Sequence, residues 1–344
     1  MKKVLAIAFA SALLVQVSCR KDDEQIVVPK GEYGNGYLIT NEGNFGTPNA
    51  SIDFISNALS GMESEIYKAK NNEDLGDVLQ SVTFSGDDAY LVVNNSNKVV
   101  VANRYTMEKK AQITEEIASP RYAAFANNQL YVTNSAYGGA QFVSVYNQAH
   151  ELVKKIDFTM TVEEIHTVGG QVFVQNASFG NGNQYSFINP SDNTITGTYS
   201  VPEGNIVNSR VYEGKLYLLV NGTANAYIHQ VETNGSIAKT YTISGMTNAK
   251  NLDIENGNFF FTAGNMIYKN AMDMETITPS EFITVQDNSW STLYGFEVIG
   301  DKVFTSDAKG FTEASEVTVY SAGDGSVLKT LTAGMGTSGF YQNN

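Results

Sequence analysis

The sequence has few of the residues on which most metal and nucleophile chemistry depends. Its 344 residues include one cysteine, three histidines, one tryptophan and six prolines. No pair of histidines stands at metal-ligand spacing, which excludes a structural zinc, and no dense run of alternating aspartates supports a calcium site. Positive charge is also scarce, since 22 Lys and Arg face 36 Asp and Glu for a net charge of −14. Such a chain has no general means of holding a phosphate backbone, so we expect neither a nucleic-acid partner nor a metal or other cofactor.

Aromatic residues, by contrast, are abundant. The chain has 19 Tyr and 18 Phe, and 42% of its residues are hydrophobic. Tyrosine and phenylalanine are enriched in strands, and a chain of this length can bury a sizeable core. Composition therefore predicts a large all-β protein.

The amino terminus reads as an export signal. Residues 1–18 contain two lysines and an apolar run from Val4 to Val15, which is too short to span a bilayer and is typical of a signal peptide. Cys19 follows Val17-Ser18, where a bacterial lipobox places its lipidated cysteine. We expect lipid at Cys19; the alternative is a signal peptide that is cleaved elsewhere and merely contains a cysteine.

Residues 19–33 are too polar to fold alone and predict a tether. Within it, Lys21-Asp22-Asp23 resembles the surface-export signal of Bacteroidota lipoproteins. The alternative is a plain solvated linker, since acidic linkers are common. The expected location is the outer membrane, lipid-anchored and exposed at the cell surface.

A pattern of about forty residues recurs along the remaining chain. Its core is a β-branched or aromatic run that usually ends in Asn or Asp, and the gaps between successive copies are 53, 41, 42, 44, 43 and 44 residues. The seven copies begin at Tyr37, Tyr90, Tyr131, Phe173, Tyr217, Phe260 and Phe304. A two-residue turn signal, such as Asn127-Asn128 or Gly169-Gly170, stands just before most of them. A repeat of about forty residues indicates a repeat architecture, which narrows the expectation of an all-β protein.

Each repeat predicts four short antiparallel strands. In the third repeat these are residues 122–126, 130–134, 142–146 and 152–158. Four strands per repeat are typical of a propeller blade, so we predict one domain over residues 34–344, a seven-bladed β-propeller. The first repeat lacks an inner strand and the chain stops at one, so we expect residues 339–344 to complete the first blade. A β-sandwich is the alternative fold.

One face of such a ring would collect the binding side chains. Loops that leave the second strand of each blade share this face with segments that enter the inner strands, and both are rich in amides, aromatics and a few cations. The candidate ligand-binding residues are Asn41, Glu42, Asn44, Phe45, Asn94, Asn95, Arg121, Tyr122, Asn134, Tyr137, His166, Asn176, Phe179, Arg210, Asn221, Asn251, Trp290 and Tyr294. The alternative is structural, because such an Asn often bonds its own turn and such an aromatic often packs between blades.

Catalytic groupings are poorly supported. Glu163 and Glu164 beside His166 could act as acid and base, with Glu42 joining them, but their spacing alone does not establish it. Serine is plentiful, yet nothing singles out a nucleophile. We therefore expect a binding protein and not an enzyme.

A family resemblance rests on these residues. The span from Gly34 to Asn344, with Tyr37-Leu38-Ile39-Thr40-Asn41 and the similar strand at residues 131–134, resembles the YncE-like and surface-layer-type seven-bladed propellers. The leader and the run Asn41-Glu42-Gly43-Asn44-Phe45-Gly46 are similar to those of Bacteroidota surface lipoproteins that bind cobalamin and sit on a TonB-dependent outer-membrane transporter. The resemblance implies capture of a corrinoid on one face and its transfer to the transporter.

Two other functional classes stay open. An adhesion or assembly scaffold would use the same face to bind a protein. A lactonase-type or quinone-type propeller enzyme would require an axial metal or cofactor. Fold alone does not separate these classes, because propellers serve both as binders and as enzymes.

Overall fold

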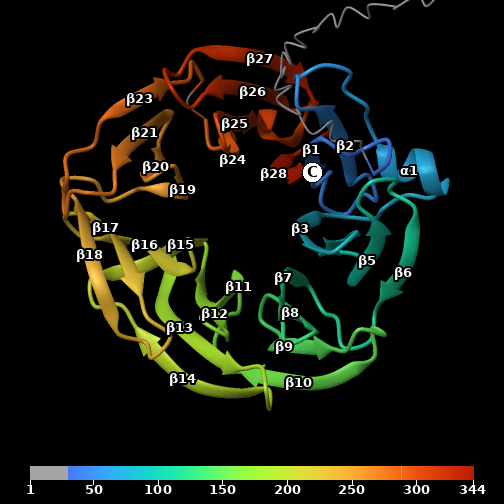
Figure 1. The fold of residues 1–344 in the computed structure, drawn as a ribbon, viewed down its shortest axis with the longest axis horizontal. Coiled ribbons are helices and arrows are strands. Elements are labelled where there is room, and N and C mark those ends of the chain that lie inside the picture. Colours follow the sequence, from blue (N-terminus) through green and yellow to red (C-terminus); the bar gives the residue numbers. More distant parts are fainter. Residues whose placement is uncertain (1–29, 288) are drawn as a thin grey trace, which may run out of the picture.

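The structure, a computed structural model, describes residues 30–287 and 289–344. They form a ring of seven small sheets around a central axis (Figure 1). The predicted signal peptide, the predicted lipidation of Cys19 and the predicted tether up to residue 29 lie outside the described residues. No helix in the described part of the chain is long and apolar enough to cross a membrane.

The seven sheets are the blades, numbered here in chain order. Blade 1 contains β28 (Thr337–Asn343), β1 (Gly36–Asn41) and β2 (Ser51–Ser56). Blade 2 contains β3 (Leu79–Ser85), β4 (Asp88–Val93), β5 (Lys98–Asn103) and β6 (Lys109–Ile113). Blade 3 contains β7 (Pro120–Ala126), β8 (Gln129–Ser135), β9 (Gln141–Tyr146) and β10 (Leu152–Phe158). Blade 4 contains β11 (Ile165–Val168), β12 (Gln171–Ser178), β13 (Asn181–Asn189) and β14 (Thr194–Ser200).

The remaining blades follow the same order. Blade 5 contains β15 (Gly204–Tyr212), β16 (Lys215–Gly222), β17 (Ala226–Val231), β18 (Ile237–Ile243) and the two-residue β22 (Thr276–Ile277). Blade 6 contains β19 (Lys250–Glu255), β20 (Asn258–Ala263), β21 (Met266–Ala271) and β23 (Glu281–Thr284). Blade 7 contains β24 (Thr292–Ile299), β25 (Lys302–Asp307), β26 (Glu316–Ser321) and β27 (Val327–Thr332). Outside the blades lie helix α1 (Ile66–Asn71) and the 3-10 turn η1 (Lys309–Phe311).

The predicted seven-bladed propeller is confirmed. All seven repeated motifs form the second strand of a blade, and in blades 2 to 7 the turn before the motif joins that strand to the inner one. Asn127 and Asn128 illustrate the turn, since both have positive φ, 48° and 57°. Asparagine tolerates this left-handed conformation, which matches the twist of a hairpin.

The ring closes within blade 1, as the sequence predicts. Strand β28 pairs antiparallel with β1 from Gly36↔Asn343 to Asn41↔Thr337. The chain's last strand is therefore the inner strand of the blade that holds its first strand, and no long edge is left open there.

Three details depart from a uniform four-stranded repeat. Blade 1 has three strands, and a single bridge between Phe54 and Glu63 takes the place of its fourth. In blade 5, β22 from the following repeat adds to β18 in parallel. Helix α1 lies in the 53-residue gap between the first two motifs, where the sequence pattern gave no indication of a helix. The long gap is thus an insertion between blades 1 and 2.

The hydrophobic core lies between neighbouring blades. Second strands are buried on both faces, whereas outer strands such as β14 and β27 are largely exposed. Between blades 7 and 1, for example, Tyr37 and Ile39 pack against Phe304 and Phe340. Each blade therefore buries its apolar side chains only when both neighbours are present, and this packing fixes the inner strands around the axis.

Candidate functional site

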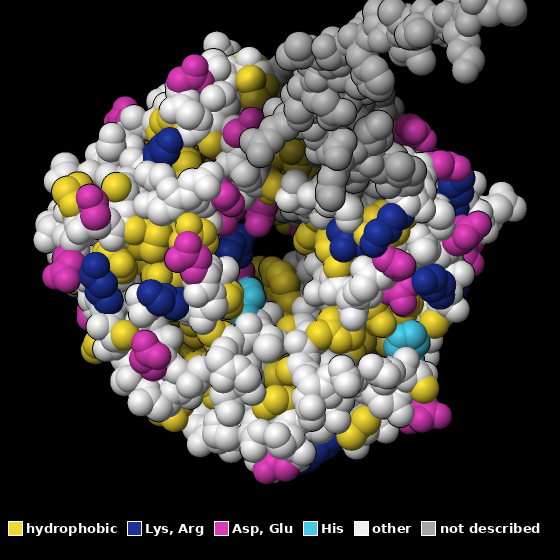
Figure 2. Space-filling view, in the orientation of Figure 1, with side chains coloured by type: hydrophobic (Ala, Val, Ile, Leu, Met, Phe, Trp, Pro, Cys, Tyr) yellow, Lys and Arg dark blue, Asp and Glu magenta, His cyan; other side chains and the backbone are white. Residues whose placement is uncertain are grey.

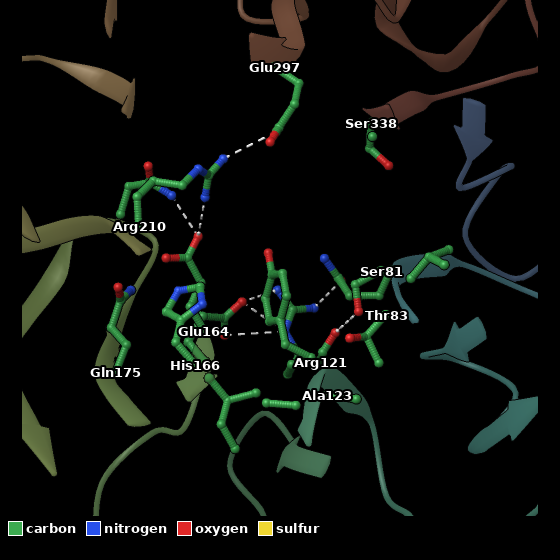
Figure 3. Close-up of a pocket in the computed structure, with 18 of the residues that line it drawn as sticks. Ser81, Thr83, Arg121, Ala123, Glu164, His166, Gln175, Arg210, Glu297 and Ser338 are labelled. Carbon is green, nitrogen blue, oxygen red and sulfur yellow. Dashed lines mark hydrogen bonds and ion pairs between the residues drawn. The ribbon is translucent and has the colours of Figure 1, made fainter. Parts of the chain in front are cut away.

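The inner strands surround a cavity of about 880 Å³ on the ring axis. Figure 2 shows its opening at the centre of the ring, with basic, acidic and histidine side chains around the edge. In Figure 3, Arg121, Glu164, Arg210 and Glu297 project toward the axis from blades 3, 4, 5 and 7. A volume of this size suits a small-molecule ligand.

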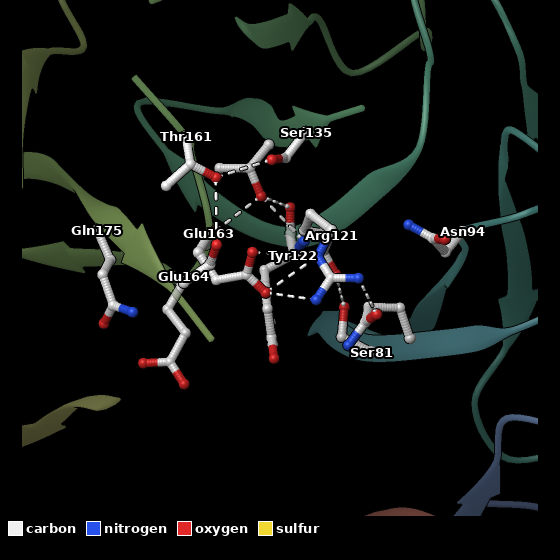
Figure 4. Close-up of polar contacts among 12 residues, drawn as sticks. Ser81, Asn94, Arg121, Tyr122, Ser135, Thr161, Glu163, Glu164 and Gln175 are labelled. Carbon is white, nitrogen blue, oxygen red and sulfur yellow. Dashed lines mark hydrogen bonds and ion pairs between the residues drawn. The ribbon is translucent and has the colours of Figure 1, made fainter. Parts of the chain in front are cut away.

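One ion pair occupies the cavity wall between blades 3 and 4. The Arg121 guanidinium donates to both oxygens of Glu163, from Nε at 3.0 and 3.2 Å and from Nη2 at 2.6 Å (Figure 4). The two side chains are 15% and 10% exposed. Arg121 also donates to Gln80 Oε1, so its charge and that of Glu163 are well satisfied.

A second guanidinium is shared among three carboxylates. Arg210, from β15, lies 3.3 Å from Glu297, 3.8 Å from Glu164 and 3.9 Å from Asp253. Burial, together with repulsion from Asp253, raises the pKa of Glu297, and Arg210 offsets this only in part. One guanidinium therefore serves three carboxyl groups.

Glu164 is held by neutral donors as well. It accepts hydrogen bonds from Asn208 Nδ2 at 2.6 Å, from Ser209 N at 2.5 Å and from Ser209 Oγ at 2.6 Å. The same Ser209 hydroxyl lies 3.0 Å from His166 Nε2. Burial lowers the pKa of His166, which keeps the imidazole neutral at pH 7.

Glu42 lies in the loop that leaves β1. Both of its oxygens accept from Tyr294 Oη, at 3.1 and 3.0 Å. Burial raises the pKa of Glu42 to about 7. No Lys, Arg or His within the described residues reaches it at salt-bridge distance, so this carboxylate lacks a cation of its own.

Eight of the eighteen predicted ligand-binding residues line the cavity. They are Glu42, Arg121, Tyr122, His166, Phe179, Arg210, Asn251 and Tyr294. They come from six blades, and the ring brings them together at the axis.

The asparagines that end second strands serve the scaffold instead. Asn94 Nδ2 donates to Pro120 O at 2.9 Å, and Asn221 bonds both N and O of Ala249. Each of these bonds ties one blade to the chain entering the next blade. Asn41, Asn134 and Asn176 are buried and bonded within their own blades. We leave all five out of the proposed site, because their polar groups are already paired.

Two further amides of the predicted set bond neighbouring loops. Asn95 donates to Asp77, and Asn44 Nδ2 donates to Phe311 O at 3.0 Å. Asp77 also accepts from Gly46 N at 2.9 Å. These contacts hold the loop from residue 42 to residue 50 in place, and with it the position of Phe45.

Four aromatic side chains stand exposed on the loop face, the face formed by the loops leaving second strands and the segments entering inner strands. They are Phe45 at 79%, Tyr137 at 108%, Phe179 at 88% and Trp290 at 72% exposure. No other aromatic residue in the described chain belongs to the strongly exposed set. Trp290 stacks on Phe311 with ring centroids 6.0 Å apart. Phe179 also lines the axial cavity. Exposed aromatic side chains on one face are typical of a binding surface.

The sequence interpretation missed two of the acids, Asp253 and Glu297. Both stand in inner strands between apolar neighbours, as in Leu252-Asp253-Ile254 and Phe296-Glu297-Val298. A charged residue inside a buried strand requires a partner, so this pattern could have indicated a charged axis. The described residues contain no group of three or more side chains suited to hold a metal ion.

The geometry defines a seven-bladed β-propeller with a charged axial cavity and an aromatic-rich loop face. The chain belongs to the family described as "Domain of unknown function (DUF5074)", whose model matches residues 35–337. No curated protein matches the sequence.

Solved structures of similar fold come from several sources. A quinonprotein alcohol dehydrogenase-like protein from Bacteroides thetaiotaomicron has a TM-score of 0.70 at 12% identity, covering 91% of this chain and 79% of its own. A protein titled putative 6-phosphogluconolactonase from Bacteroides fragilis has a TM-score of 0.64 at 10% identity, covering 91% and 99%. Identities this low establish the fold alone.

Proposed function

We propose that the protein is a surface lipoprotein that captures a small ligand on its loop face, best a corrinoid such as cobalamin, and passes it to a TonB-dependent outer-membrane transporter without chemical turnover. The observation that carries the proposal is the set of exposed aromatics Phe45, Tyr137, Phe179 and Trp290 on the loop face, of which Phe179 also lines the axial cavity. A corrin ring offers a broad apolar face with hydrogen-bonding groups at its edge, which suits aromatic side chains next to a polar cavity.

The conformation of Phe179 supports a binding role. It is the first residue of the two-residue turn between β12 and β13, with φ of 50°. Bulky residues avoid this left-handed conformation, and such strain clusters at ligand-binding sites. The ring is 88% exposed, and the Arg121 guanidinium lies 5.7 Å from its centroid, so the ring has one cation contact and a large free surface for a ligand.

Calorimetry of the full-length protein with cyanocobalamin tests the ligand. We expect heat of binding, and colour retained on desalting. Replacing Phe179 and Trp290 by Ala should weaken binding at least about tenfold, since aromatic anchors contribute most to such sites. Val327→Ala, at a residue 60% exposed on the outer strand β27, is the matched control and should bind as the wild type does. No heat and no retained colour would exclude cobalamin.

The membrane steps have separate tests. Cys19→Ala should prevent incorporation of labelled fatty acid and release the protein from the membrane fraction. Replacing Lys21, Asp22 and Asp23 by Ala should leave the lipid but remove the protein from the cell surface, measured by protease accessibility in intact cells.

Co-purification with a TonB-dependent transporter tests the proposed partner. If the protein is instead an assembly scaffold, it should retain a different protein and no corrinoid.

A further inference from the structure

The axial cavity is richer in hydrogen-bond acceptors and negative charge than its own residues can satisfy. Two guanidinium groups face five carboxylates there, four in the cavity wall and Asp253 behind Arg210. Arg121 is committed to Glu163, and Arg210 is divided among Glu164, Asp253 and Glu297. Carboxylates held out of water and left without a cation are costly, unless they are protonated or a cation joins them.

Unpaired amide oxygens provide an independent observation. Gln175 is 1% exposed and lines the cavity (Figure 3). Its Nε2 donates to Ala177 O at 2.8 Å, but its Oε1 accepts no hydrogen bond from the described residues. Asn208, 9% exposed, also lines the cavity, and its Oδ1 is likewise unpaired while its Nδ2 serves Glu164. Buried amide oxygens normally find a donor, so both point to a missing one.

The cavity wall adds aromatic surface to this acceptor set. Tyr122, Tyr294, Phe296 and Tyr341 contribute rings from blades 3, 7 and 1. Ring faces attract cations, and carboxylates beside them strengthen that preference. An anion would instead meet the four carboxylates of the wall. Arg121 is engaged with Glu163, and Arg210, whose Nε has no hydrogen-bond partner among the described residues, lies within 4 Å of three acids.

We propose that the axial cavity is a binding site for a small cation of the alkylammonium class, in particular a diamine, with one ammonium group donating to Glu42 of blade 1 and the other to the unpaired oxygens of Gln175 and Asn208 of blades 4 and 5. This site lies below the aromatic loop face and does not depend on the corrinoid proposal. An ammonium group supplies three donors and one positive charge, which the wall lacks.

The site's affinity should depend on pH. The titratable and charged groups that face it are Glu42, Arg121, Tyr122, Glu163, Glu164, His166, Arg210, Asp253, Tyr294, Glu297 and Tyr341. Burial raises the pKa of Glu42 to about 7 and also raises that of Glu297. Both carboxylates are therefore more fully charged at pH 9 than at pH 6, while an alkylammonium with a pKa near that of lysine, about 10.4, is still largely protonated.

Calorimetry of the full-length protein with 1,4-diaminobutane tests the proposal, and neutral 1,4-butanediol is the matched ligand. We expect the diamine to bind at pH 9, at least about tenfold more weakly at pH 6, and the diol not to bind at either pH. Equal binding of diamine and diol, or no heat from the diamine at pH 9, would overturn the proposal. These wild-type measurements need no variant to fold.

Variants then locate the site. Glu42→Gln should weaken diamine binding at pH 9 at least about tenfold and reduce its pH dependence, leaving the part that comes from Glu297. Glu232→Gln, at an exposed residue in the turn between β17 and β18, removes an equal charge far from the axis and should leave binding unchanged. Equal losses in the two variants would mean that general surface charge holds the diamine, which would contradict an axial site.

Discussion

Arg104 and Asn343 lie 239 residues apart in the chain and are joined by a hydrogen bond of 2.6 Å from Arg104 Nε to Asn343 Oδ1. The amide of Asn343 donates in turn to Tyr33 O at 2.6 Å and to Arg104 O at 2.8 Å. One buried side chain thus fastens the last strand both to the segment before β1 and to blade 2.

Asn343→Ala should lower the free energy of unfolding by about 1–3 kcal/mol. The substitution removes the hydrogen-bond partner of two backbone carbonyls, those of Tyr33 and Arg104, and of the Arg104 guanidinium. Urea denaturation measures the change. Gln342→Ala, at the exposed neighbouring position, is the control and should alter stability by no more than about 0.5 kcal/mol. Equal effects of the two substitutions would contradict the role given to Asn343.

Removing residues 339–344 should lower the melting temperature by roughly 10 °C or more. Loss of the buried Phe340 alone resembles a Phe→Ala change of about 3–5 kcal/mol, and each kcal/mol shifts the melting temperature of a large domain by about 2–4 °C. Thermal unfolding followed by circular dichroism checks this. An unchanged melt would show that β28 does not close the ring.

Arg121→Gln should destabilise the fold by about 3–5 kcal/mol, because it leaves the Glu163 carboxylate buried without its cation. The double variant Arg121→Gln with Glu163→Gln should recover a large part of that loss. A double-mutant cycle in urea measures the coupling. Additive effects would mean that the two side chains do not act as a pair.

Stability should fall as the pH rises from about 4.5 to 7. Burial raises the folded-state pKa of Glu42 from 4.5 to about 7, so the folded protein holds this proton more tightly than the unfolded chain does. The unfolded state therefore gains by ionising in this window, and the penalty is complete above pH 7, up to about 3 kcal/mol. Glu163, Asp253 and Glu297 also have pKa values raised by burial and act in the same direction.

Glu42→Gln isolates that contribution. Its melting temperature should match that of the wild type near pH 5 and exceed it at pH 8. Melting curves of both proteins across this range give the difference. A wild type that is more stable than Glu42→Gln at pH 8 would reverse the sign and refute the argument.

Phe179→Asn should separate stability from binding. Asparagine followed by Gly180 is well suited to the left-handed turn between β12 and β13, so the variant should be more stable by about 1 kcal/mol. The same change removes an exposed ring from the loop face and should weaken cyanocobalamin binding. Denaturation and calorimetry on one preparation give both values, and a variant that is less stable would show that the turn is not strained.

Sequence predicted the ring because strand patterns and turn residues are local and repeat. Each motif from Tyr37 to Phe304 is a short β-branched or aromatic run, and most have a hairpin signal just before them. The closing strand could be predicted because the first repeat lacks an inner strand and the chain stops at one. Helix α1 was not predicted, because its six residues are too few to show a detectable amphipathic period.

The site was only partly predictable because side-chain partners depend on packing between blades. Asn94 and Tyr122 both stand on the expected face, yet the first bonds Pro120 O and the second lines the cavity. Nothing in the local pattern separates a strand-end amide that clamps a neighbouring loop from one that is free. The sharing of Arg210 among Glu164, Asp253 and Glu297 joins four blades, and sequence order alone does not bring them together.

The composition of blade 1 also bears on biosynthesis. Strand β1 leaves the ribosome before every other strand of the propeller, whereas its inner neighbour β28 leaves after all of them. During that interval the ring cannot close, and β1 presents an unpaired edge of the kind that recruits other chains into aggregates. A protein truncated before β28 would have nearly all of its blades but an unpaired, aggregation-prone edge on β1. Synthesis of the final strand therefore protects solubility as well as the closed ring.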